Sequence, residues 1–291
     1  MEKVSISNEL ITIEVKTHGA ELVSLVKNDS KREYMWCGDA KYWGRVSPVL
    51  FPFVGKLENQ KYTHNGITYE NIPQHGFARD SEFKIVEQTE DTLWFELIKD
   101  EKWSQNYPYD FTLRIGYRIE GSSVHVMWTV INDGNQKLHF SIGAHPAFAC
   151  EDGIAGCSLD LHTNKESLEC GILNENGVLK NQTVAYPLSN GRLELTDNLF
   201  DDDALVIDGK GINTVTLSDK EDKPVLQLKF DTPQLGIWSP AKAHAPFICI
   251  EPWYGRCDRE GFDGTLAERE YSNSLEAGHS FNKEYVIEII F

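Results

Sequence analysis

The chain has 291 residues, of which 41% are hydrophobic and 25% are charged, a composition typical of a folded globular protein. Its 45 acidic and 28 basic residues give a net charge of −17 with no basic block, so we expect no nucleic-acid or membrane partner. No apolar run approaches the roughly 20 residues of a membrane-spanning helix, and the polar start of the chain is unlike a signal peptide, so we expect a cytoplasmic protein.

Apolar and polar residues alternate along most of the chain, which is typical of strands. Near the N-terminus, Ile11, Ile13 and Val15 fall on one face of such a strand. Long helical periodicity is missing, so any helix should be short, and 199–206 is a candidate helical turn. The predicted hairpins cover 83–98, 111–132 and 215–230, with turns at 89–91, Gly121 and 219–224, and a last strand covers 281–291.

Strands that follow one another through hairpins, without helices between them, predict a mainly antiparallel sandwich or barrel. The chain contains no low-complexity linker that would separate two domains. We therefore expect an all-β fold in which residues 1–291 form a single large antiparallel β-sandwich with only short helices.

The cysteines are scattered and contain no C-x-x-C pair. In so large a chain without a secretion signal, reduced thiols are expected in preference to a disulfide framework. Their spacing also gives no support to an all-thiolate zinc site. The six residues are Cys37, Cys150, Cys157, Cys170, Cys249 and Cys257.

Three segments carry more reactive and aromatic side chains than a connection requires. The loop "IPQHGFARDSEF" contains His75 and Arg79, and "FSIGAHPAF" places His145 after a strand end. The run "YWGRVSPVLFPFVGKL" holds Arg45 and Lys56 and is too rich in proline for a central strand. Any one of these segments alone is more often an ordinary polar loop.

A fourth segment, "APFICIEPWYG", ends an apolar strand with an acid. Phe247, Cys249 and Glu251 share one face of this strand. Burial would raise the pKa of Glu251 toward neutrality, which suits a general base. Alternatively, Glu251 is a structural acid held by backbone amides or by Arg256.

The motifs "SPVLFPFVGKL", "HGFAR", "GAHPAF", "EPW" and "LEAGHSF" together resemble the aldose 1-epimerase (galactose mutarotase) family, in a divergent bacterial-type branch. The resemblance runs over nearly the whole chain. It implies a large β-sandwich that uses no cofactor and interconverts the α and β anomers of a free sugar. By position, His75 and His145 match the two active-site histidines of the family, and Glu251 matches its base.

The resemblance also implies a sugar-binding aspartate, matched by Asp203, with Asp201 and Asp202 left as alternatives. At one edge of the expected sugar site the sequence departs from the best-studied branch of the family. That branch has an Asn-Arg pair where this chain has Gly55 and Lys56. The sugar contacts there should differ, so the resemblance does not carry over a preference for galactose.

Mutarotation itself requires a base at the anomeric hydroxyl and an acid at the ring oxygen, with roles that reverse. A desolvated Glu and a His can both have pKa values near 7, and no metal is needed. We therefore expect Glu251, His145 and His75 to be catalytic. The expected substrate-binding residues are Asp203, Arg45, Lys56, Arg79, Trp238 and Trp253, and Trp43 is a further candidate for an aromatic platform, although core packing is the commoner role of any one Trp.

Alternatives remain. Two His and one carboxylate could hold iron or manganese, although cupin-type H-x-H spacing is missing. A non-catalytic sugar-binding module is a second alternative, and a hexose-6-phosphate mutarotase is a third if Arg45, Lys56 and Arg79 converge.

The expected partner is a small sugar, and the expected assembly is a monomer or a homodimer. The remaining histidines, expected to be structural or solvated, are His18, His64, His125, His139, His162, His244 and His279.

Overall fold

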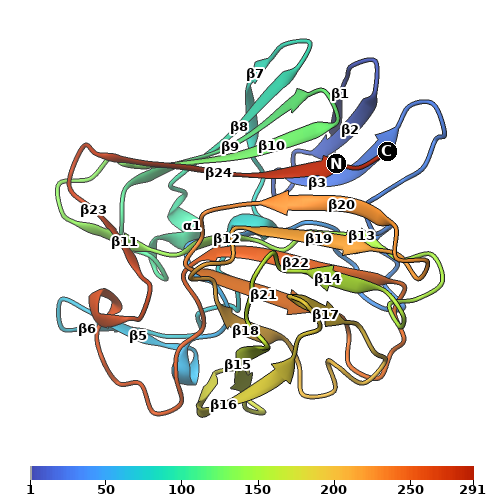
Figure 1. Cartoon of the computed structure of the whole chain (residues 1–291). Helices are drawn as coiled ribbons and strands as arrows, with labels where there is room; N and C mark the ends of the chain where they lie inside the picture. The colour runs from blue at the N-terminus through green and yellow to red at the C-terminus, as the bar shows by residue number, and fades with distance from the viewer. Residues whose placement is uncertain (1) are drawn as a thin grey trace.

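Strands dominate the computed structural model, which describes residues 2–291 (Figure 1). All the paired strands within its sheets are antiparallel, so the predicted all-β fold is confirmed. The largest sheet has nine strands, in the order β17 (Arg192–Glu194), β14 (Ser158–Asp160), β19 (Thr214–Ser218), β20 (Pro224–Lys229), β24 (Ser280–Ile289), β10 (Ser123–Asn132), β9 (Phe111–Glu120), β8 (Thr92–Ile98) and β7 (Lys84–Gln88).

A second sheet has eight strands. Its order is β16 (Leu179–Pro187), β15 (Ser167–Leu173), β18 (Leu205–Asp208), β21 (Gln234–Trp238), β22 (Phe247–Tyr254), β12 (Ile142–Ala144) and β4 (Val49–Leu50), and β13 (Ala147–Ala149) also pairs with β22. The central strand β22 is buried along its whole length.

Smaller elements complete the fold. Three strands form a sheet of their own: β1 (Lys3–Ser7), β2 (Ile11–Lys16) and β3 (Glu21–Lys27). Two pairs stand apart: β5 (Tyr62–His64) with β6 (Ile67–Tyr69), and β11 (Leu138–Phe140) with β23 (Asn273–Leu275). The helices are α1 (Glu101–Ser104) and the 3-10 turns η1 (Glu58–Gln60), η2 (Ala78–Asp80) and η3 (Leu266–Glu268). Within residues 2–291, no helix has the length and apolar character needed to cross a membrane.

The local predictions can be compared strand by strand. The predicted hairpins form as β7–β8, β9–β10 and β19–β20, and the predicted last strand is β24. The turn of the β19–β20 hairpin is shorter than expected because Pro224 already opens β20. The candidate helical turn at 199–206 is not helical: it forms turns and then enters β18 at Leu205. The proline-rich run 42–57 contributes only the short strand β4, at the edge of its sheet.

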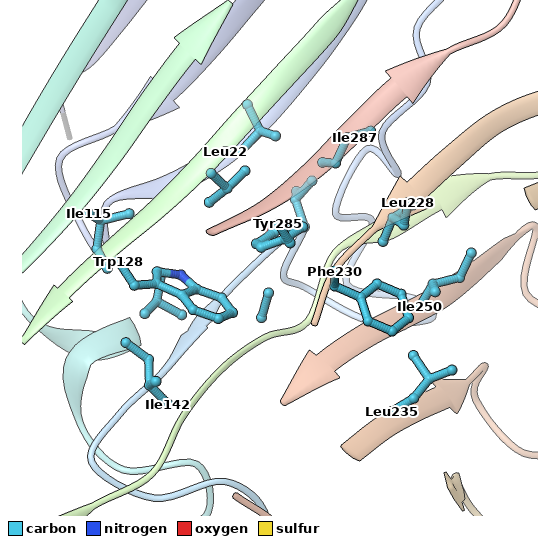
Figure 2. Close-up of a cluster of buried hydrophobic side chains, with 14 of the residues drawn as sticks. Leu22, Ile115, Trp128, Ile142, Leu228, Phe230, Leu235, Ile250, Tyr285 and Ile287 are labelled. Atoms are coloured by element: carbon cyan, nitrogen blue, oxygen red, sulfur yellow. The ribbon is translucent and has the colours of Figure 1, made fainter. Parts of the chain in front are cut away.

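The main core fills the space between the two large sheets. Figure 2 shows Trp128, Tyr285 and Ile287 of the nine-stranded sheet near Leu235 and Ile250 of the eight-stranded sheet, all of them buried. Burying each large apolar side chain stabilises the fold by roughly 1.5–3 kcal/mol. Because the side chains of β22 alternate, its opposite face is free to line a site.

The cysteines are all free thiols, as expected, and all except Cys37 are buried.

Candidate active site

One cleft gathers residues that lie far apart in the sequence. It has a volume of about 720 Å³ and opens beside the outer face of the eight-stranded sheet. All of the predicted site residues except Arg45 line it: Lys56, His75, Arg79, His145, Asp203, Trp238, Glu251 and Trp253. The sequence-predicted residues therefore converge in space, and Arg45 is the exception.

Glu251 lies in the floor of this cleft, in the middle of β22. The alternation of β22 places Ile248 and Ile250 in the main core, whereas Phe247 and Cys249 belong to a separate cluster on the side of Glu251. The Glu251 side chain is only 1% exposed. Arg256, the partner expected if Glu251 were structural, pairs instead with Glu270.

Trp253 forms the wall next to Glu251. Its indole ring occupies space that is left by two glycines, since a Cβ on Gly143 or Gly236 would lie 2.6 Å or 2.3 Å from the ring. The ring nitrogen donates a hydrogen bond to the carbonyl oxygen of Ala144 at 3.2 Å. These contacts fix the ring, so Trp253 presents a rigid edge to the cleft.

His145 follows β12, and its ring is enclosed by aromatic side chains. Trp43 stacks on it at 4.7 Å between ring centroids, and Trp238 packs edge-on at 5.5 Å. The ring nitrogen Nδ1 is buried without a hydrogen-bond partner. Trp43 and Trp238 therefore hold the imidazole in place and remove water from around it.

His145 and Glu251 form a buried pair in which Nε2 of the histidine lies 3.3 Å from Oε2 of the glutamate. Burial raises the pKa of Glu251 well above its ordinary value, and the nearby charge of Asp203 raises it further. Burial also lowers the pKa of His145 to about 3. Over the pH range between these values the pair holds one proton, and the two shifts place it on Glu251 at rest.

His75 approaches the pair from the loop before η2. Its ring lies 5.7 Å from the ring of His145, nearly perpendicular to it. The backbone amide of Gly55 donates to Nδ1 of His75 at 3.1 Å, so the proton of the neutral ring is on Nε2. Burial, with a contribution from the charge of Arg79, lowers the pKa of His75 well below its ordinary value. His75 is therefore a neutral hydrogen-bond donor.

Gly76, the second residue of the "HGFAR" motif, has a structural reason to be glycine. Its φ is +69°, and a Cβ there would lie 2.2 Å from the carbonyl oxygen of Phe51. The chain can approach Phe51 this closely only without a side chain. Gly76 thus holds the loop that carries His75 against the neighbouring segment.

Three consecutive acids, Asp201, Asp202 and Asp203, also line the cleft. They lie in the turn before β18, where Asp203 has a positive φ of +77°. Asp203 is the one whose charge contributes to the raised pKa of Glu251. Of these three acids, Asp203 is therefore the one with an electrostatic effect on Glu251.

The predicted arginines are already partly engaged. Arg45 does not line the cleft and pairs with Asp80 at 2.8 Å. Arg79 lines the cleft, but it donates to the carbonyl oxygen of Gln74 at 2.7 Å and lies 3.7 Å from Asp80. Both arginines shape the loop of His75.

Several lining residues were missed from the sequence. They include Gln74, next to His75, and Lys180 at the start of β16. The turn between β15 and β16 also contributes Asn174, Glu175 and Gly177. Nothing in the sequence around Lys180 signals a site, because its position depends on how β16 lies beside segments distant in the chain.

One group within residues 2–291 could hold a metal ion. It consists of His145, Cys249 and Glu251, whose ligand atoms lie within 4.8 Å of one another. This set differs from the two-histidine, one-carboxylate site considered from the sequence, because a thiol replaces His75. Burial raises the pKa of the Cys249 thiol well above its ordinary value, which disfavours the thiolate that a metal would need.

The fold is that of galactose mutarotase-like proteins. A structure of a galactose mutarotase-related enzyme from Lactobacillus acidophilus is 30% identical, with a TM-score of 0.93, and the match covers 100% of this chain and 98% of that one. A galactose mutarotase-like protein from Lactobacillus casei is 27% identical, with a TM-score of 0.92, over 99% of this chain and 100% of that one.

Sequence comparison gives the family. The model of the family "Aldose 1-epimerase" matches residues 2–283. The plasmid-encoded protein LacX of Lactococcus lactis subsp. lactis is 33% identical in an alignment of 270 residues, and the match covers 87% of this chain and 87% of that one. The chain belongs to the aldose 1-epimerase family, as the motifs predicted.

Proposed function

We propose that the protein is an isomerase that interconverts the α and β anomers of a free sugar without a cofactor. The observation that carries this proposal is the buried pair of His145 and Glu251, 3.3 Å apart in the cleft. The hydroxyl oxygen and the ring oxygen that exchange protons in this reaction are bonded to the same carbon. An acid and a base that act on them must therefore lie close together.

The single proton shared by the pair suits the reaction. In the reactive form the proton of Glu251 has passed to His145 across their 3.3 Å contact, so Glu251 takes the proton of the anomeric hydroxyl while His145 gives its proton to the ring oxygen, and the ring opens. After rotation about the bond between C1 and C2, the same two groups close the ring on the other face with reversed roles. At every stage one member is an acid and the other a base, and each positioned proton transfer contributes about 10²–10⁴-fold.

The other lining residues have binding roles in this proposal. His75, with its proton on Nε2, donates a hydrogen bond near the ring oxygen. Asp203 accepts hydrogen bonds from sugar hydroxyls, and Trp238 offers an aromatic edge to the C–H face of the sugar. Trp253 limits the space beside Glu251.

We also propose that the chain works as one domain. The main core cluster contains buried residues from Val4 to Ile289, so the two ends of the chain contribute to the same interior. The proposal predicts a single cooperative unfolding transition in urea, followed by both fluorescence and circular dichroism. Two separated transitions would show that the chain contains two units.

A mutarotation screen tests the proposed activity. Freshly dissolved aldoses of several configurations are followed by polarimetry and by exchange NMR, with the spontaneous rate subtracted. At least one sugar should equilibrate faster with the protein, and the acceleration should disappear in Glu251→Gln. Sugar binding without acceleration of any aldose would instead favour a non-catalytic sugar-binding module.

A further inference from the structure

Two lysines in the cleft have no acidic partner. Lys56 and Lys180 are half-buried and line the cleft, yet within residues 2–291 no carboxylate lies within 4.0 Å of either ammonium group. Both ammonium groups are therefore available to an anionic ligand, although acidic residues outnumber basic ones by 45 to 28 in this chain.

The backbone brings the two lysines together. The amide of Asp258 donates to the carbonyl oxygen of Lys56 at 3.0 Å, and the amide of Leu179 donates to the carbonyl oxygen of Asp258 at 2.8 Å. Lys180 follows Leu179 directly. The side chain of Lys56 extends toward the turn that precedes β16, because its Cδ lies 3.0 Å from where a Cβ of Gly177 would be.

The same segment is joined to the proposed catalytic residues. Lys56 follows Gly55, whose amide donates to the ring of His75 at 3.1 Å. The charges of Arg79 and Lys56 both contribute to the low pKa of His75, whereas the charge of Asp203 contributes to the high pKa of Glu251. Cationic side chains thus act on His75 and the acid Asp203 acts on Glu251, while the exposed acid Glu175 also lines the cleft.

We propose that Lys56 and Lys180 form a subsite for an anionic group on the sugar, remote from its anomeric carbon. This inference rests on the proposed function and specifies its substrate class as an aldose that carries a phosphate monoester or a carboxylate. Unpaired ammonium groups bind such anions through charge-assisted hydrogen bonds. Because the protein as a whole is acidic, a local cationic site is needed to accept an anion.

The test compares matched sugars: an aldohexose, its 6-phosphate and its 6-carboxylate. Exchange NMR gives kcat/KM for each with the wild type, Lys56→Gln, Lys180→Gln and the control Lys84→Gln. Lys84 is exposed on β7, in the other large sheet and outside the cleft. The decisive quantity is the ratio of kcat/KM for the charged sugar to that for the neutral sugar.

The wild type should favour one of the two charged sugars, and which of them it favours distinguishes phosphate from carboxylate. Each cleft variant should lower the ratio about tenfold, the usual worth of one charge-assisted hydrogen bond, whereas Lys84→Gln should leave it unchanged. Raising the salt concentration should lower the wild-type ratio. A wild type that prefers the neutral sugar, or cleft variants that keep the ratio, would overturn the subsite while leaving the mutarotase proposal intact.

A binding measurement separates the two proposals if no sugar is equilibrated. Calorimetric titration with the 6-phosphate and with inorganic phosphate reads the subsite without turnover. Binding that is lost in the double variant Lys56→Gln/Lys180→Gln would support the subsite although the activity had failed. Absence of binding of all charged probes to the wild type would refute the subsite.

Discussion

Gly55 and His75 are joined by two hydrogen bonds that run in opposite directions. The amide of His75 donates to the carbonyl oxygen of Gly55 at 2.9 Å, and the amide of Gly55 donates to Nδ1 of the His75 ring at 3.1 Å. The first bond fixes the backbone, and the second fixes both the orientation and the tautomer of the ring. The proton on Nε2 faces the side-chain amide of Gln74, 3.2 Å away, which also lines the cleft.

His75→Ala should therefore lower turnover more than stability. Loss of a positioned donor costs about 10²–10³-fold in kcat, and the amide of Gly55 left without its partner costs about 1–3 kcal/mol of unfolding free energy. Anomer exchange and urea unfolding are measured side by side, with His279→Ala, an exposed histidine outside the cleft, as the control. A destabilised variant whose folded fraction is fully active would make His75 structural.

Glu251→Gln should remove the base and keep the shape of the side chain. We expect kcat to fall by about 10²–10⁴-fold, with sugar affinity changed far less. Exchange NMR and a binding titration on an accepted sugar provide the two values. Glu175→Gln, which removes an exposed acid from the same cleft, is the matched control and should stay active. Near-normal exchange in Glu251→Gln would place the base elsewhere.

His145→Asn should cost a similar factor, because His145 and Glu251 share one proton and act as a unit. The double variant His145→Asn/Glu251→Gln should then be little slower than either single variant. The three rate constants are measured under the same conditions on the same sugar. Losses that multiply would show that the two side chains act independently.

The buried pair should also give the stability a defined pH dependence. The folded pKa of Glu251 is raised above its ordinary 4.5, so its contribution is complete below that pH and is lost as the pH rises through the folded value. The folded pKa of His145 is lowered from 6.5 to about 3, so its contribution is complete above pH 6.5 and is lost as the pH falls. The contribution of the pair is greatest at about pH 5.5, midway between the ordinary values.

Single variants separate the pH-dependent contribution of Glu251 from that of His145. As the pH rises from 5.5 to 8, the unfolding free energy of Glu251→Gln should increase relative to that of the wild type. As the pH falls from 6.5 to 4.5, the unfolding free energy of His145→Asn should increase relative to that of the wild type. Each gain should be at least about 1 kcal/mol, the value of one pKa unit. Urea unfolding at four pH values provides the measurement. Parallel curves for all three proteins would mean that the pair does not titrate as described.

Gly76→Ala should destabilise the protein and displace His75. The new Cβ would meet the carbonyl oxygen of Phe51 at 2.2 Å in addition to the strain of a positive φ. Gly121→Ala is the matched control, since Gly121 has a φ of +58° but no heavy atom near its Cβ position. We expect the control to lose about 1–2 kcal/mol and Gly76→Ala to lose about 1–3 kcal/mol more. If urea unfolding showed that both variants lose the same unfolding free energy, the contact with Phe51 would not be a cause of the loss in Gly76→Ala.

The sequence predicts the strands well, because alternation is a local property that each hairpin carries within about twenty residues. It predicts the turn at 199–206 poorly. The apolar residues at the end of that segment fit a helix or a strand, and pairing of β18 with β15 and β21 decides the matter. The choice depends on strands that are distant in the sequence.

The site was predictable only through the family motifs, since no spacing rule places His75 beside His145 and Glu251. Arg45 was expected in the site from its charge and not from a family motif, and charge alone does not reveal a competing partner. Its guanidinium is taken up by Asp80, a partner 35 positions away, and it does not line the cleft. Lys180 was missed for the related reason that backbone pairing through Asp258 brings it next to Lys56.

The cleft has a floor made by the sheet and a rim made by turns. The buried pair belongs to the floor, whereas Asp201–Asp203, Asn174–Gly177 and Pro240–Ala241 belong to the rim and are for the most part solvent-exposed. Exposed turns tolerate substitution and insertion at little cost in folding free energy. The range of accepted sugars is therefore open to evolution, or to a library of turn variants, while the proton-transfer groups stay the same.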